Sequence, residues 1–121
     1  MFTVKVKEHI MIAHSLPDPF FGPAQHMHGA TYVTEVTFMR PQLNDKNVVI
    51  DIGEASAITK SVLDELNYQN LDELPQFAGK LTTTEFLAHY IHTRIKEQLS
   101  EKLRMRVELL ESHVASASYE D

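Results

Sequence analysis

Residues near the two ends of the chain alternate between polar and apolar side chains, as half-buried strands do. Residues Phe2–His14 alternate before turning apolar, and residues Gly29–Met39 are rich in β-branched and aromatic side chains. Shorter stretches of the same character lie at Arg104–Glu111 and Ala115–Glu120. The pattern therefore predicts two pairs of strands, one at each end of the chain.

Between these pairs, apolar residues recur at helical spacing. One helix is predicted over Glu54–Glu65. A second is predicted to begin within Thr82–Glu85, whose first and last residues have the spacing of a capping box. Its apolar face then carries Leu87, Ile91, Ile95 and Leu99. The order is ββααββ, and paired sequential strands join best as antiparallel hairpins. We expect an α+β fold in which two helices cover one face of a four-stranded antiparallel sheet.

The chain length fits one domain spanning residues 1–121. With 121 residues, of which 43% are hydrophobic, it can bury one modest core. A sheet of this size leaves two unprotected edges, which small domains commonly pair with another subunit. We therefore expect a homo-oligomer.

Composition excludes several classes of function. The chain has no cysteine, so any metal must be held by His, Asp or Glu. A formal net charge of −6 argues against a nucleic-acid partner. No apolar run approaches the roughly 18 residues of a membrane span, and the N-terminus lacks the pattern of a signal peptide. The expectation is a cytoplasmic protein without a membrane partner.

Three histidines form the strongest candidate for a metal site. His14 ends the first predicted strand, and His26 and His28 sit at alternate positions at the mouth of the second. Alternate positions of a strand share a face, so these imidazoles could meet one zinc ion and leave a coordination position open. The alternative is a histidine-bearing loop that is partly exposed.

Two further polar pairs allow more than one interpretation. Glu111 and His113 would face the same side if the backbone stays extended there. A carboxylate at that point can accept two hydrogen bonds from a cyclic amidine, such as the N–H and amine edge of a pterin or guanine, or it can belong to a solvated turn. His89 and His92, three residues apart on the second helix, fit either a metal pair or, preferably, a solvated helix face.

Several segments, in one order along the chain, resemble the 6-pyruvoyl-tetrahydropterin synthase and 6-carboxytetrahydropterin synthase family. The family's His-Gly-His-Asn-Tyr motif corresponds to His28–Tyr32, and its Asp-His-Lys-Asn-Leu-Asp motif to Asn67–Asp72. Its Thr-Thr-Glu helix start corresponds to Thr83–Glu85, and its terminal glutamate and tyrosine to Glu111 and Tyr119. The resemblance implies the tunnelling fold, with subunits joined as a homo-trimer or hexamer and pterin pockets between them.

The sequence departs from the family at its catalytic positions. The family's cysteine falls at Ala24, its Asp-His pair at Asn67 and Tyr68, and its third zinc ligand at Ala30. The family's proton relay cannot run through these residues, since none of the expected thiol, acid or imidazole is present. His26 or His113 is expected to replace the missing zinc ligand in a rebuilt site.

The resemblance implies a role for each remaining residue. Zinc would be held by His14, His28 and one of His26 or His113, and a pterin-like molecule by Glu111 with Thr83, Thr84 and Glu85. Tyr68 or His113 would shuttle a proton in a lyase or isomerase reaction on the pterin side chain. The alternative is a non-catalytic pterin-binding protein, or a structural oligomer with a vestigial pocket.

Overall fold

Two long antiparallel strands form the centre of the sheet in the computed structural model, which describes residues 1–121. Strand β1 spans Phe2–His14 and strand β2 spans His28–Arg40. Their register pairs Phe2 with Arg40 at one end and His14 with His28 at the other. Because this pairing is continuous, two histidines from distant points of the sequence meet at one end of the sheet.

The sheet has five strands in the order β3-β1-β2-β4-β5, not four. Strands β4 (Arg104–Leu110) and β5 (Ser116–Glu120) form the expected antiparallel hairpin beside β2. The additional strand, β3 (Gln69–Asn70), runs parallel to β1 and makes the sheet mixed. The prediction of a purely antiparallel sheet was therefore wrong on this edge, because a strand of two residues has no periodic pattern to detect.

Side-chain and backbone contacts just before β3 hold that edge together. The Tyr68 N–H donates to the Met11 carbonyl oxygen over 2.7 Å, and the Met11 N–H donates to Asn67 Oδ1 over 2.9 Å. Asn67 therefore serves as a partner for the backbone of β1. Tyr68 adopts a left-handed conformation with φ of 60°, which is strained for a bulky L-residue.

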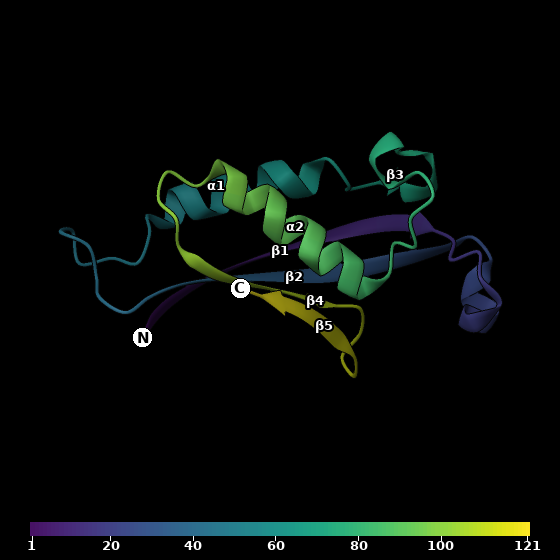
Figure 1. Ribbon diagram of the computed structural model, residues 1–121, viewed down its shortest axis with the longest axis horizontal. Coiled ribbons are helices and arrows are strands. Elements are labelled where there is room, and N and C mark those ends of the chain that lie inside the picture. The colour runs from purple at the N-terminus through teal and green to yellow at the C-terminus, as the bar shows by residue number, and fades with distance from the viewer.

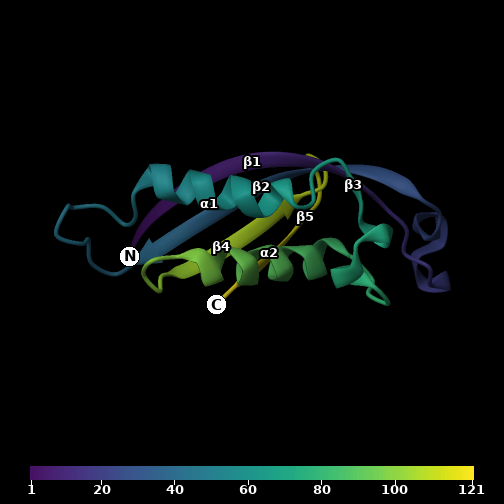
Figure 2. The same ribbon diagram turned by 90° about the horizontal axis from the view of Figure 1, so that it is seen from above.

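Two α-helices, α1 (Ile52–Asp64) and α2 (Thr84–Gln98), lie on one face of the sheet, as predicted (Figures 1 and 2). Helix α1 packs on β1, and α2 packs on β4 and β5. Short 3-10 helices, η1 (Pro19–Gln25), η2 (Leu71–Glu73) and η3 (Pro75–Phe77), occupy the connections. No helix combines the length and apolar character that crossing a membrane requires.

The helix starts show why the boundaries shift from those predicted. Asp51 caps α1 by accepting the Gly53 and Glu54 N–H groups, so this helix begins two residues before the predicted Glu54. Thr83, not Thr82, caps α2, since its hydroxyl accepts the Phe86 N–H over 3.1 Å. Thr82 is instead buried beneath the end of β1.

The core lies between the sheet and the helices and consists of alternate residues from each central strand together with the apolar stripes of α1 and α2. Its largest fully buried side chains include Tyr32, Phe38, Leu63, Leu66, Ile91 and Met105. The opposite face of the sheet is polar. There Lys5 lies 2.7 Å and Lys7 3.4 Å from Glu35, and both lysines are exposed.

Candidate functional site

The end of β1, the start of β2, the beginning of α2 and the turn after β4 line a cavity of about 250 Å³. Of the nine site residues predicted from the sequence, six line this cavity: His14, His28, Thr83, Thr84, Glu85 and Glu111. Leu16, Phe21, Ala24 and Tyr32 complete its wall. The register of the sheet and the start of α2 thus gather residues that are almost 100 positions apart in the sequence.

The two histidines of the cavity are held as a pair. The His14 and His28 ring centroids lie 4.6 Å apart, and the planes meet at 66°. His14 is buried, with Nδ1 2.9 Å from the Thr82 hydroxyl oxygen. His28 Nδ1 lies 2.8 Å from the His26 carbonyl oxygen, which can only accept, so this nitrogen is the donor. Because both Nδ1 atoms are engaged, each ring keeps Nε2 for another partner.

The surroundings of His14 favour its neutral form. Burial lowers the pKa of His14, and the neighbouring His28 lowers it further. Asp72, the Thr82 backbone and Glu111 oppose this shift to a smaller degree. Asp72 also fixes the exit from β1 by accepting the Ser15 N–H over 3.1 Å and its hydroxyl over 2.5 Å. A neutral imidazole is the form that ligates a metal.

The donor set fits two zinc ligands but not a third. His14 and His28 offer free Nε2 atoms with hydrogen-bonded Nδ1 atoms, the usual arrangement of metal-binding imidazoles. Ala30 replaces the third ligand expected from the family. His26 and His113 are exposed and do not line the cavity. No three His, Asp or Glu side chains converge as a ligand group anywhere in the chain.

A hydrogen-bonded carboxylate forms the other end of the cavity. Glu111 directly follows β4, and the Thr84 hydroxyl donates to its Oε2 over 3.2 Å. Behind them lies Tyr32, whose pKa is raised above its ordinary value, mainly by burial. A hydrogen bond with Thr84 opposes this rise, and the Glu111 and Glu85 carboxylates add to it. Sequence reasoning did not assign Tyr32 to the site. Its position four residues after His28, on the same face of β2, was the available signal.

Three predicted site residues lie outside the cavity. Tyr68 is 78% exposed on the outer side of β1, beside Met11. Residues 111–114 bend instead of extending, so the condition for Glu111 and His113 to share a face is not met. His26 contributes its carbonyl oxygen to His28, whereas its side chain faces solvent. Within one chain, neither predicted proton shuttle reaches the cavity.

Only one histidine of the helix pair His89 and His92 lies on a solvated face. His92 is buried, with its ring centroid 4.7 Å from that of Tyr119 and its Nε2 3.2 Å from Asp121 Oδ1. His89 is exposed but also lies against the Tyr119 ring, at 4.3 Å. The interpretation as a solvated face was therefore wrong for His92, because β5 packs over this part of α2.

Comparisons with known proteins agree with this fold. The sequence profile of the 6-pyruvoyl tetrahydropterin synthase family matches residues 3–121. A 6-pyruvoyl tetrahydropterin synthase structure from Caenorhabditis elegans superposes with a TM-score of 0.89 at 23% identity, covering 99% of this chain and 95% of that one. The corresponding Plasmodium falciparum structure gives 0.76 at 16% identity, covering 98% of both chains.

An uncharacterized protein from Wolinella succinogenes shares the fold as well, with a TM-score of 0.76 at 15% identity and coverage of 99% and 98%. No curated protein sequence matches the chain. Structural likeness at such identities shows the fold, whereas the profile match over nearly all residues shows the family. The chain belongs to the 6-pyruvoyl tetrahydropterin synthase family.

Proposed function

We propose that the cavity binds a pterin-like heterocycle and that Glu111 recognises its ring. The observation that carries this function is the Glu111 carboxylate at the cavity, held by the Thr84 hydroxyl through one oxygen. A carboxylate has about four acceptor sites, so Thr84 leaves room for two further N–H donors. The N–H and amine edge of a pterin supplies two such donors side by side.

A second copy of the chain is expected to complete the pocket. The cavity of one chain, at about 250 Å³, is smaller than the roughly 300 to 1,000 Å³ of ordinary small-molecule sites. The uncovered outer face of the sheet and its edges are available for such an assembly. We infer a homo-trimer or hexamer in which Tyr68, exposed at the β1 edge, approaches the pocket of a neighbouring copy.

For catalysis, we propose metal-assisted lyase or isomerase chemistry on the side chain of the bound pterin. His14 and His28 would hold zinc, and His26 or His113 would supply a third ligand after moving toward the cavity. When bound, the metal would polarise a side-chain oxygen and make the adjacent C–H more acidic. The protein's own residues orient the heterocycle through Glu111, and Tyr68 or the histidine not used as ligand moves the proton.

A second candidate is a pterin-binding protein without turnover. The number of metal ligands at the cavity favours this candidate. Only the two imidazoles of His14 and His28 converge there, and an open site with two protein ligands holds metal poorly. It also agrees with the exposed positions of Tyr68 and His113. In this case the Glu111 end of the cavity is retained for binding alone.

Elemental analysis of protein purified without a histidine tag, combined with pterin titration, separates these possibilities. Metal and pterin binding together support the enzyme, pterin binding without metal supports the binder, and neither supports a structural oligomer. His14→Ala and His28→Ala should each abolish zinc binding, and only one of His26→Ala and His113→Ala should do so. Full zinc occupancy in the His14→Ala, His28→Ala double variant would refute the metal site.

A further inference from the structure

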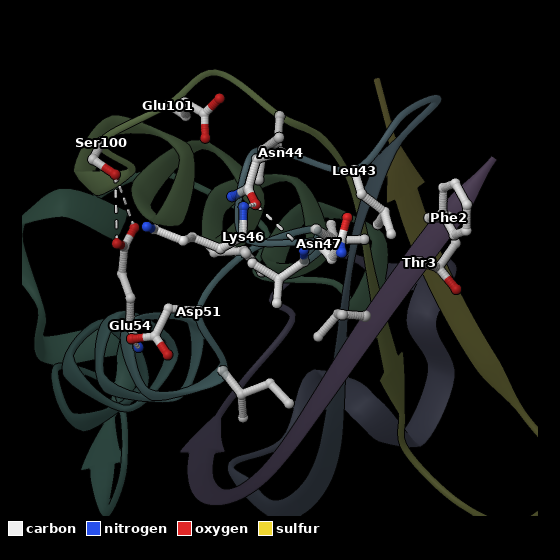
Figure 3. A pocket seen from close by; sticks show the side chains of 16 residues that line it. Phe2, Thr3, Leu43, Asn44, Lys46, Asn47, Asp51, Glu54, Ser100 and Glu101 are labelled. Atoms are coloured by element: carbon white, nitrogen blue, oxygen red, sulfur yellow. Dashed lines mark hydrogen bonds between the residues drawn. The ribbon is translucent and has the colours of Figure 1, made fainter.

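A cavity larger than the candidate site lies at the opposite end of β1. It has a volume of about 790 Å³ and is enclosed by the start of β1, the segment before α1, and the connection between α2 and β4 (Figure 3). Phe2 and Val4 line it, whereas His14 lines the other cavity. Twelve steps of about 3.3 Å along β1, at most about 40 Å, separate Phe2 from His14, so the two cavities lie at opposite ends of this strand.

The floor of this cavity is apolar and its mouth exposes further apolar side chains. Val49, Ile50 and Leu103 are buried beneath it. At the mouth, Phe2 is 49% and Ile52 61% exposed. Single exposed apolar residues are common, but a group of them around a hollow indicates a binding surface. The volume also lies within the range of about 300 to 1,000 Å³ for small-molecule sites.

The charged groups around the cavity are mostly carboxylates. Asp51, Glu54 and Glu101 line it, against a single ammonium group from Lys46. Asp51 is engaged in capping α1, and Glu101 lies 3.3 Å from the Arg40 guanidinium. Glu54 is held instead by a neutral donor, the Ser100 hydroxyl, 3.1 Å from Oε2. Glu54 is in no ion pair, but the Lys46 side chain extends across the hollow toward it (Figure 3), so a bound cation would compete with Lys46 for this carboxylate.

The mouth is preformed. Asn44 Oδ1 accepts the N–H groups of Lys46, over 2.9 Å, and Val48, over 3.3 Å. Asn47 takes the left-handed conformation, with φ of 61°, that asparagine tolerates better than most residues. Figure 3 shows Glu54, Ser100 and Glu101 on one side of the hollow and Phe2 on the other. A ligand would find the floor and the carboxylates already in place, which reduces the entropy lost on binding.

We propose that this second cavity binds a small amphipathic organic cation. Its apolar or aromatic body covers Val49, Ile50 and Leu103, and its ammonium group lies against Glu54. An anion is disfavoured there, since the N-terminus of α1 is already occupied by Asp51 and the surrounding groups are mainly negative. The site does not depend on pterin binding at Glu111.

Tryptamine is a suitable probe, because the chain has no tryptophan and indole emission reports the probe alone. Fluorescence anisotropy should show saturable tryptamine binding to the intact protein and much weaker binding of the anionic indole-3-propionate. Glu54→Gln keeps the side-chain shape and should weaken tryptamine binding about tenfold, the loss of one charge-assisted hydrogen bond. The matched control Glu73→Gln changes the same charge on η2, outside the cavity.

Circular dichroism melting curves would confirm that both variants fold. Equal tryptamine affinity in wild type and Glu54→Gln, or equal binding of the two indole compounds, would overturn the site. Binding that appears only when dilution dissociates the assembly would also overturn it, because the cavity would then be covered by a second copy of the chain.

Discussion

Thr82→Val tests whether the buried contact beneath His14 stabilises the end of β1. Thr82 is 2% exposed, and its hydroxyl lies 2.9 Å from His14 Nδ1. Valine keeps the shape but replaces the hydroxyl with a methyl group. One neutral hydrogen bond contributes about 1 kcal/mol net. For 121 residues, an unfolding entropy of about 2.1 cal/mol/K each gives roughly 0.25 kcal/mol/K, so the midpoint should fall by about 4 °C.

Thermal melting followed by circular dichroism, at one fixed protein concentration, measures this change. Thr93→Val is the control, because Thr93 is exposed on α2 and the same substitution there should change the stability by less than about 0.5 kcal/mol. Equal midpoints for Thr82→Val and wild type would show that the Thr82 hydroxyl does not contribute to holding His14.

Three further predictions concern the strained edge, pH and assembly. Alanine at position 68 keeps the Cβ atom that strains the left-handed conformation, whereas glycine removes it. The free energy of unfolding, measured by urea titration, should therefore be about 1 kcal/mol higher for Tyr68→Gly than for Tyr68→Ala. The reverse order of the two variants would contradict this. Burial, and to a smaller degree Lys96, lowers the pKa of His92, so as the pH falls the unfolded chain takes up a proton at this residue before the folded chain does. Stability should therefore fall as the pH drops from about 6.5 through the lowered pKa. His92→Gln should flatten that fall, and an unchanged pH profile in this variant would contradict the prediction. Light scattering should find a trimer or hexamer, and a stable monomer at micromolar concentration would rule out assembly through the sheet edges.

The order of the large elements could be predicted because each has a periodic pattern longer than a few residues. Both long strands and both α-helices follow from alternation or helical spacing alone. Strand β3 could not be predicted, since Gln69–Asn70 is too short for any period and pairs with residues of β1 that are distant in the sequence. The capping residue of α2 was placed one residue early for a related reason: Thr82 and Thr83 are chemically alike, and tertiary packing decides which one is buried.

The candidate site was partly predictable because the family's motifs mark its residues. His14 and His28 meet through the register of β1 and β2, which the structure supplies. The positions of His26 and His113 depend on turns whose backbone direction has no clear signal in the sequence. The role of Asn67 was likewise hidden, because an asparagine that accepts a β1 N–H looks the same in sequence as a lost catalytic acid. Long-range hydrogen bonds decide such cases.

Titration calorimetry with a panel of pterins on wild type and Glu111→Gln tests the central claim most directly. Glutamine preserves the shape but exchanges one acceptor oxygen for a donor. Because Glu111 is expected to accept two N–H groups, the variant should bind its preferred pterin about 2 kcal/mol more weakly, roughly thirtyfold. Glu73→Gln, which changes the same charge on η2, should bind like wild type. Equal pterin affinities for wild type and Glu111→Gln would contradict ring recognition by Glu111.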